Sequence, residues 1–166
     1  MAIRDFELFH GAVLARILRK GRRVALTMIE TKPAESWSAY RINDVASLYV
    51  KYCAAPDQRK RDEALVWQFT FDVRHLEEVA RLQQEGDVYV ALVGGNSDVK
   101  RRGTEICLLY PGEFGRCVDV GSPDPQSICV VSVPRRQLLA RGGGWSERTE
   151  IKVPRDRLST LEVPGS

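Results

Sequence analysis

The hydrophobic residues near the start of the chain recur with the spacing of a helix. One apolar stripe at helical spacing is formed by Phe6, Phe9, Val13, Leu14, Ile17 and Leu18. The pattern predicts a helix over residues 5–20 that buries one side against a flat apolar surface.

From residue 24 onward the hydrophobic period changes to two, which is typical of β-strands. The alternation recurs in several short stretches, and residues 88–93 form a continuous apolar run of the kind that is covered on both faces of a sheet. Helical spacing returns only after Asp72, a candidate N-cap. We therefore expect an α+β fold: a mixed β-sheet of about eight short strands with two main helices, residues 5–20 and 73–85, packed on it.

The chain has 166 residues, of which 43% are hydrophobic and 28% are charged. This length and composition are typical of one globular domain with its own core. We expect a single domain over residues 1–166. A loop rich in Gly and Pro at residues 121–126 precedes a possible small β appendage at residues 127–160.

The four cysteines are widely spaced and none forms a C-x-x-C motif, so they do not suggest a zinc site. Widely spaced free thiols are typical of a reducing compartment. Asp5 and Glu7 come before any hydrophobic run, which we do not expect of a secretory signal. Its longest apolar stretch, Val88–Gly95, is too short to cross a bilayer. We expect a cytoplasmic protein with no membrane partner.

Arginines gather in one short segment of a chain whose net charge is only +3. Arg16, Arg19, Arg22 and Arg23 lie within eight residues, and Arg41 interrupts an otherwise apolar strand. A guanidinium binds two phosphate oxygens at once, so these five arginines are candidate nucleic-acid-binding residues. Solvated surface charges are the alternative explanation of the same cluster.

The order helix, three-stranded meander, further strand, helix, buried strand resembles the αβββαβ core of the PD-(D/E)XK nuclease-like superfamily. In that family an acid ends the second strand and an acid-x-lysine motif lies on the third. Here Asp44 ends the second predicted strand, and Tyr49-Val50-Lys51 occupies the acid-x-lysine position. The resemblance covers roughly residues 5–93 and requires an additional strand.

The resemblance implies a metal-dependent phosphodiesterase site at the open end of the meander. In such a site carboxylates hold Mg²⁺ and a lysine activates the attacking water. The implied catalytic residues are Asp44 and Lys51. The implied metal ligands are Asp44 and Glu7 from the first helix, with Glu30 as a further candidate. This chain departs from the family at Tyr49, because a phenol is a poor Mg²⁺ ligand at neutral pH.

Three functions remain open at this stage. The first is a nucleic-acid-associated protein with a degenerate nuclease-like core, non-catalytic and without a cofactor. The second is a protein-interaction or oligomeric assembly module. The third is a Mg²⁺-dependent phosphodiesterase or nuclease. Aromatic residues in strands serve either as core packing or as a platform on which nucleic-acid bases stack. The sequence leaves both roles open for Trp37, Tyr40, Tyr49 and Tyr52.

Overall fold

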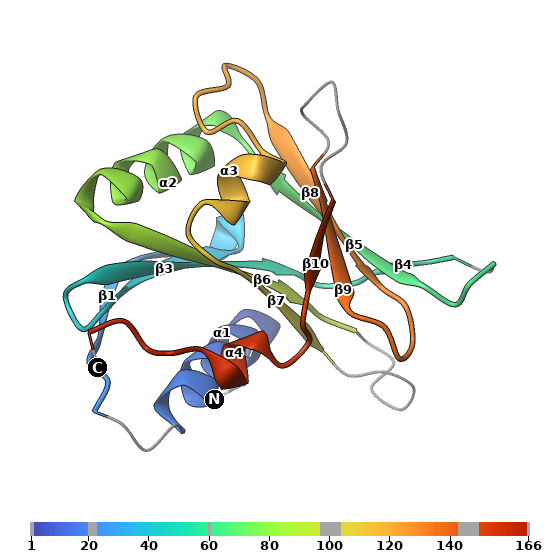
Figure 1. Ribbon diagram of the computed structural model, residues 1–166, viewed down its shortest axis with the longest axis horizontal. Coiled ribbons are helices and arrows are strands. Elements are labelled where there is room, and N and C mark those ends of the chain that lie inside the picture. Colours follow the sequence, from blue (N-terminus) through green and yellow to red (C-terminus); the bar gives the residue numbers. More distant parts are fainter. Residues whose placement is uncertain (1, 20–22, 60, 97–103, 143–149, 166) are drawn as a thin grey trace.

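The computed structural model is an α+β fold built on two five-stranded sheets (Figure 1). It describes residues 2–19, 23–59, 61–96, 104–142 and 150–165. The helices are α1 (Asp5–Leu18), α2 (Val73–Glu85), α3 (Glu113–Cys117) and α4 (Arg157–Thr160), with a 3₁₀ turn, η1 (Pro33–Glu35). None of the described helices has the length and apolar character needed to cross a membrane.

Sheet A has the strand order β1-β2-β3-β6-β7. Its β3 and β6 strands run parallel, and the other neighbours are antiparallel. Sheet B has the order β10-β9-β8-β5-β4 and is antiparallel throughout. The strands of sheet A are β1 (Leu26–Lys32), β2 (Trp37–Ile42), β3 (Ala46–Cys53), β6 (Asp87–Gly94) and β7 (Glu105–Leu109). Those of sheet B are β4 (Asp57–Gln58), β5 (Leu65–Phe71), β8 (Gln126–Ser132), β9 (Leu138–Gly142) and β10 (Glu150–Val153).

The predicted α+β class is confirmed, with corrections in detail. The described residues form ten strands rather than about eight, and the strands divide into two sheets rather than one. The additional strands include β4, whose two residues are too few to show any alternation. Helix α2 matches its predicted range, whereas α1 ends at Leu18, with Arg19 as its C-cap.

Sheet A is buried on both faces. Figure 1 shows α1 and α4 on one side of it and α2 and α3 on the other. On the α1 side, Val13 and Ile17 pack with Leu48 and Val50 of β3 and with residues of the C-terminal segment. The opposite face joins α2, α3 and the inner face of sheet B in a second and larger core. Strands β8–β10, from the possible appendage, contribute to this second core.

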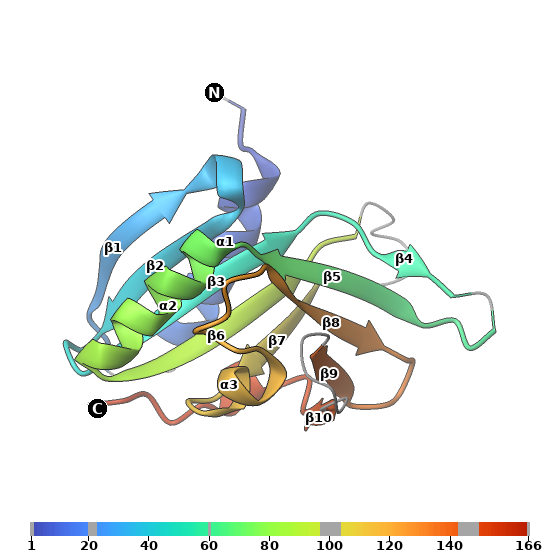
Figure 2. The ribbon, with the colours of Figure 1, turned by 90° about the horizontal axis from the view of Figure 1, so that it is seen from above.

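The side chain of Trp67 joins the two sheets. It lies fully buried on β5, and its Nε1 donates to the carbonyl of Gly95 at the end of β6, 2.7 Å away. The indole covers Gly94 so closely that a Cβ at that position would lie 2.5 Å from two ring atoms. Figure 2 shows β5 of sheet B extending away from sheet A and projecting with β4 beyond the rest of the molecule.

Replacing Gly94 with alanine therefore forces the Trp67 ring to move. We expect Gly94→Ala to lower the free energy of unfolding by about 1–3 kcal/mol, the usual cost of overpacking a core. Gly115→Ala is the matched control, because a Cβ there meets open space within α3. It should be neutral or slightly stabilising in urea denaturation. Equal losses in the two variants would contradict this role of Trp67.

His10 is buried on the inner face of α1. It is 3% exposed, its ring centre lies 4.0 Å from that of Phe6, and neither ring nitrogen has a hydrogen-bond partner among the described residues. Burial lowers the pKa of His10 to about 4. The imidazole is therefore neutral when α1 is docked on sheet A.

This burial should make α1 docking sensitive to acid. Between pH 6.5 and about 4 the unfolded chain binds a proton at His10 that the folded chain excludes, so stability falls as the pH falls. We expect the wild type to lose about 3 kcal/mol over this window relative to His10→Leu, as measured by urea denaturation at several pH values. Parallel pH profiles of the two proteins would contradict the prediction.

Candidate functional site

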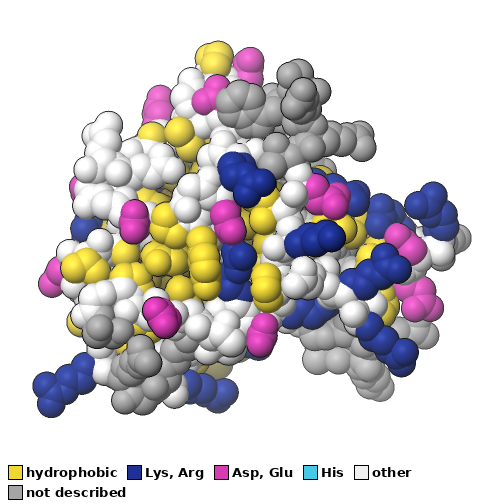
Figure 3. Space-filling model, in the orientation of Figure 1, with side chains coloured by type: hydrophobic (Ala, Val, Ile, Leu, Met, Phe, Trp, Pro, Cys, Tyr) yellow, Lys and Arg dark blue, Asp and Glu magenta, His cyan; other side chains and the backbone are white. Residues whose placement is uncertain are grey.

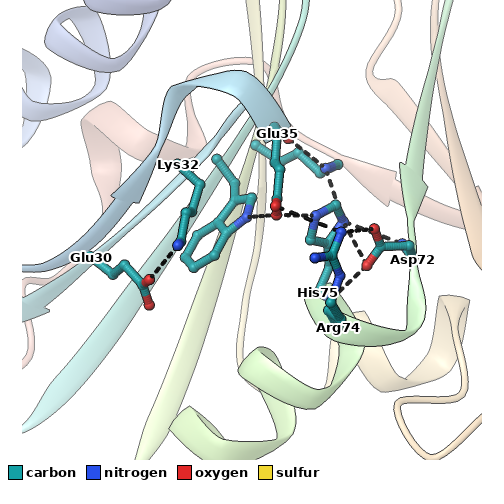
Figure 4. A network of polar contacts seen from close by, with 8 residues as sticks. Glu30, Lys32, Glu35, Asp72, Arg74 and His75 are labelled. Carbon is teal, nitrogen blue, oxygen red and sulfur yellow. Dashed lines mark hydrogen bonds and ion pairs between the residues drawn. The ribbon is translucent and has the colours of Figure 1, made fainter.

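A cluster of polar side chains lies where η1, β2, β3 and the start of α2 meet (Figure 4). We call it the polar cluster; its members are Glu35, Trp37, Lys51, Asp72, Arg74 and His75. It combines two carboxylates, two cations, an imidazole and an indole, and it is the part of the described chain where charged groups enter the core.

Local backbone structure brings these residues together. Strands β2 and β3 are antiparallel, and Trp37 pairs with Lys51 in their register. The turn η1 immediately before β2 carries Glu35 past the end of this pair. Asp72 follows β5 and caps α2 by accepting from the backbone N–H of His75 at 3.0 Å. The predicted capping role of Asp72 is confirmed, and the side chain of His75 completes a capping box with it.

The hydrogen bonds of His75 define which of its nitrogens carries the proton. The backbone N–H of Asp72 donates to Nδ1 at 3.2 Å, so Nδ1 presents its lone pair. The hydrogen therefore lies on Nε2, which donates to Oε2 of Glu35 at 2.9 Å. With this tautomer the neutral imidazole is satisfied on both sides.

Glu35 is held in its ionised form by its neighbours. Its Oε2 accepts from Nε1 of Trp37 at 3.1 Å as well as from His75, and Oε1 lies 3.7 Å from the guanidinium of Arg74. The hydrogen bond from Trp37 and then that from His75 lower the pKa of the Glu35 carboxyl. Arg74 also lies 3.7 Å from Asp72, so one exposed cation faces both carboxylates.

The amine of Lys51 points into the protein. The residue is 5% exposed, and its Nζ donates to the backbone carbonyl of Glu35 at 3.3 Å and lies 3.5 Å from Nδ1 of His75. The Nζ atom also lies 5.2 Å from the ring centre of Phe71. Burial lowers the pKa of Lys51 to about 8, although the negative charges of the nearby carboxylates act to raise this pKa.

Tyr49, in the position of the family's middle acid, is a core residue. It is fully buried, stacks on Trp37 with ring centres 5.1 Å apart, and its hydroxyl has no hydrogen-bond partner in the described part of the chain. Burial raises the pKa of the phenol far above its usual value. A neutral phenol in this setting supplies no charge for a metal ion.

Asp44 and Lys51 do not share a site, contrary to the expectation from the sequence. Asp44 lies exposed in the turn between β2 and β3, whereas Lys51 lies near the far end of β3. From Ala46, the first residue of β3, to Lys51 the strand extends about 17 Å. The sequence pattern placed the acid after β2, whereas the Lys51 amine donates to the backbone carbonyl of Glu35, which precedes β2.

The two other proposed metal ligands also lie apart. Glu7 is on α1, which packs on the face of sheet A opposite to Tyr49, and it accepts from the backbone N–H of Arg4 at 2.8 Å. Glu30 lies on β1, where it forms an ion pair of 3.3 Å with Lys32. Within the described ranges, no group of three or more His, Cys, Asp and Glu side chains is arranged to hold a metal ion.

The candidate nucleic-acid-binding arginines fall into two groups. Arg16, Arg19 and Arg23 are exposed, and none of them forms an ion pair with another described residue. Arg22 lies outside the described residues. Arg41 is not free to bind a phosphate, because its guanidinium forms an ion pair with Glu85 at the end of α2. Its position within an apolar strand reflects this pairing.

Sequence reasoning missed Glu35 and underestimated His75. Glu35 lies in a short turn that reads only as a loop, so no periodicity marked it. His75 takes part in the capping box of α2, but its second nitrogen faces a residue 40 positions away, which no local pattern indicates. A buried lysine on β3 was the one available signal, because such a charge requires nearby acceptors.

The burial of Lys51 leads to a test in alkaline solution. Between about pH 8 and 10.5 the unfolded chain keeps a proton on Lys51 that the folded chain has released, so stability rises with pH. We expect the wild type to gain about 3 kcal/mol relative to Lys51→Met across this window, as measured by urea denaturation. A difference between the two proteins that does not change with pH would contradict the lowered pKa.

Comparisons with family models, curated proteins and solved structures find no match to this chain. The function must therefore be argued from the geometry alone.

Proposed function

We propose that this chain is a non-catalytic, nucleic-acid-associated protein that binds the phosphate backbone through the basic segment Arg16, Arg19 and Arg23. The observation that carries the proposal is the exposure of these three arginines without an ion-pair partner among the described residues. The nuclease-like core expected from the order of elements in the sequence stays part of the proposal and not its basis.

The basic segment is well placed to follow a phosphate chain. Arg16 and Arg19 are one helical turn apart on α1, so their side chains are neighbours. Arg23 lies just before β1, in the connection that leads from this helix into sheet A. Figure 3 shows Lys and Arg side chains projecting at the lower left of the molecule, where the start of β1 lies. A phosphate backbone offers anions at the spacing that such a segment can contact.

The burial of the aromatic residues favours contacts with the phosphate backbone of a nucleic acid over stacking with its bases. Trp37, Tyr40 and Tyr49 are at most 5% exposed, and Tyr52 stacks on Phe9 of α1 with ring centres 4.7 Å apart. They therefore serve as packing and offer no platform for unpaired bases. Binding through the basic segment alone should be insensitive to sequence, because phosphate contacts carry no base information.

The polar cluster supports the non-catalytic part of the proposal. The Lys51 amine is directed at Glu35 and His75, and the carboxylates of Glu35 and Asp72 face Arg74. Such mutual neutralisation is typical of a structural network rather than of a site that awaits a metal and substrate. The separation of Asp44 from Lys51 likewise does not favour the Mg²⁺-dependent phosphodiesterase considered above. We accordingly propose no cofactor.

A cytoplasmic location is part of the same proposal. The four cysteines, Cys53, Cys107, Cys117 and Cys129, are all free thiols, and two of them are fully buried. Burial raises the pKa of Cys117 to about 11, so this thiol stays protonated and unreactive at neutral pH. Free thiols in these positions agree with a reducing compartment.

The proposal is tested by the salt dependence of binding. For Arg16→Gln/Arg19→Gln/Arg23→Gln we expect weaker binding to a random-sequence DNA duplex, measured by fluorescence anisotropy. The slope of log K against log salt should become shallower by up to about 3, since each lost phosphate contact contributes about 0.9. Single-stranded and duplex DNA of several sequences should respond alike.

The control is a second triple variant with the same change in charge. Arg61→Gln/Arg116→Gln/Arg136→Gln removes three exposed arginines elsewhere on the molecule, and each triple lowers the formal net charge from +3 to 0. The control should retain the slope of the wild type. Equal weakening in both triples, or no detectable binding by the wild type at low salt, would remove the proposed function.

A further inference from the structure

The outer side of α1 is apolar, although it faces solvent. The inner side of the helix buries His10, Val13 and Ile17 against sheet A. The opposite side carries an apolar row that we call the outer stripe, formed by Leu8, Gly11, Ala15 and Leu18. Leu8 and Leu18 are 54% and 53% exposed, among the most exposed large hydrophobic residues described.

The fold of one chain does not explain this stripe. A surface helix normally places charged and polar residues opposite its buried face, and a helix that is apolar on both sides is normally covered on both. Gly11 is a further anomaly, since a Cβ there meets no atom within 4 Å. A mid-helix glycine costs about 1 kcal/mol relative to alanine. The outer stripe therefore has the composition of a surface that packs against a second molecule.

The spacing of the stripe is the same in both directions along the helix. Leu8 and Gly11 are three residues apart, Gly11 and Ala15 four, and Ala15 and Leu18 three. A second copy of α1 can pack antiparallel on the outer stripe, about a two-fold axis that crosses the stripe midway between Gly11 and Ala15. Leu8 of each copy then meets Leu18 of the other. Gly11 then meets Ala15, and these two small residues allow the helix backbones to approach closely. A two-fold contact needs such a self-complementary surface.

Charge favours the same antiparallel arrangement. Asp5 and Glu7 lie in the first turn of α1, while Arg16 and Arg19 lie at its end, and all four are exposed. An antiparallel pair places the acidic end of one helix beside the basic end of the other, whereas a parallel pair would place like charges together. Arg23 lies beyond the helix, outside this contact.

We propose that the chain forms a two-fold symmetric dimer through antiparallel packing of the outer stripes of two α1 helices. The helix is about 21 Å long, so the contact is smaller than the roughly 1,600 Å² of a standard stable interface. The dimer is accordingly reversible and depends on protein concentration. The contact itself is made by the apolar side of α1, but Arg16 and Arg19 at its margin also belong to the proposed phosphate-binding segment, so the dimer is tested without nucleic acid.

The test is sedimentation velocity of the full chain without nucleic acid, over about a hundredfold range of concentration. We expect the wild type to pass from monomer to dimer, and Leu8→Glu/Leu18→Glu to stay monomeric throughout. The matched control is Met28→Glu/Val45→Glu, which adds the same charge at residues that are 55% and 51% exposed elsewhere. This control should dimerise like the wild type.

A second variant separates the contact from the stability of the helix. Gly11→Leu places a bulky side chain in the open space at the centre of the stripe, and leucine favours helix more than glycine does. We expect circular dichroism to show an intact fold and the dimer dissociation constant to rise at least about tenfold. A wild type that stays monomeric, or equal losses in the test and control variants, would overturn the dimer without bearing on the proposed function.

Discussion

The burial of β3 on both faces is the constraint on which the rest of the structure depends. This strand pairs with β2 and β6, and it packs against α1 on one face and against α2 and the second core on the other. Water therefore cannot satisfy any charge on its buried part, and the one charged residue it carries is Lys51. The protein must provide the acceptors itself.

The polar cluster follows from this requirement. The carbonyl of Glu35 and the imidazole of His75 face the amine of Lys51, and Glu35 and His75 are bonded to each other. These contacts tie the η1 turn of sheet A to the first turn of α2. The arrangement that makes the cluster unsuited to hold a metal is thus the one that fixes α2 on the sheet.

The positions of the helices and strands could be predicted from the sequence more accurately than the pairing of the strands. Helix α2 matched its predicted range because both of its ends carry clear signals, a capping Asp72 and a terminal Gly86. Alternation identified most strands, but it states only which side chains share a face and not which strand lies alongside. The division into two sheets therefore could not be predicted from it.

The residues of the candidate site lie apart for a related reason. A pattern of period two does not tell which end of a hairpin faces a neighbouring helix, so Asp44 was placed beside Lys51 and Glu35 was not considered. Charged pairs such as Arg41 with Glu85 join residues far apart in the chain, and no local pattern announces them. Lys51 was identified correctly as unusual, whereas its partners became visible only in three dimensions.

The edges of sheet B have a consequence for how the molecule behaves when crowded. One edge strand, β4, contains two residues, Asp57 and Gln58, and the other, β10, alternates exposed Glu150 and Lys152 with buried residues. A long flat edge would offer a template on which foreign strands could add and fibrils could grow. Both edge strands are too short and too charged to serve as such a template, which limits misassembly through sheet B.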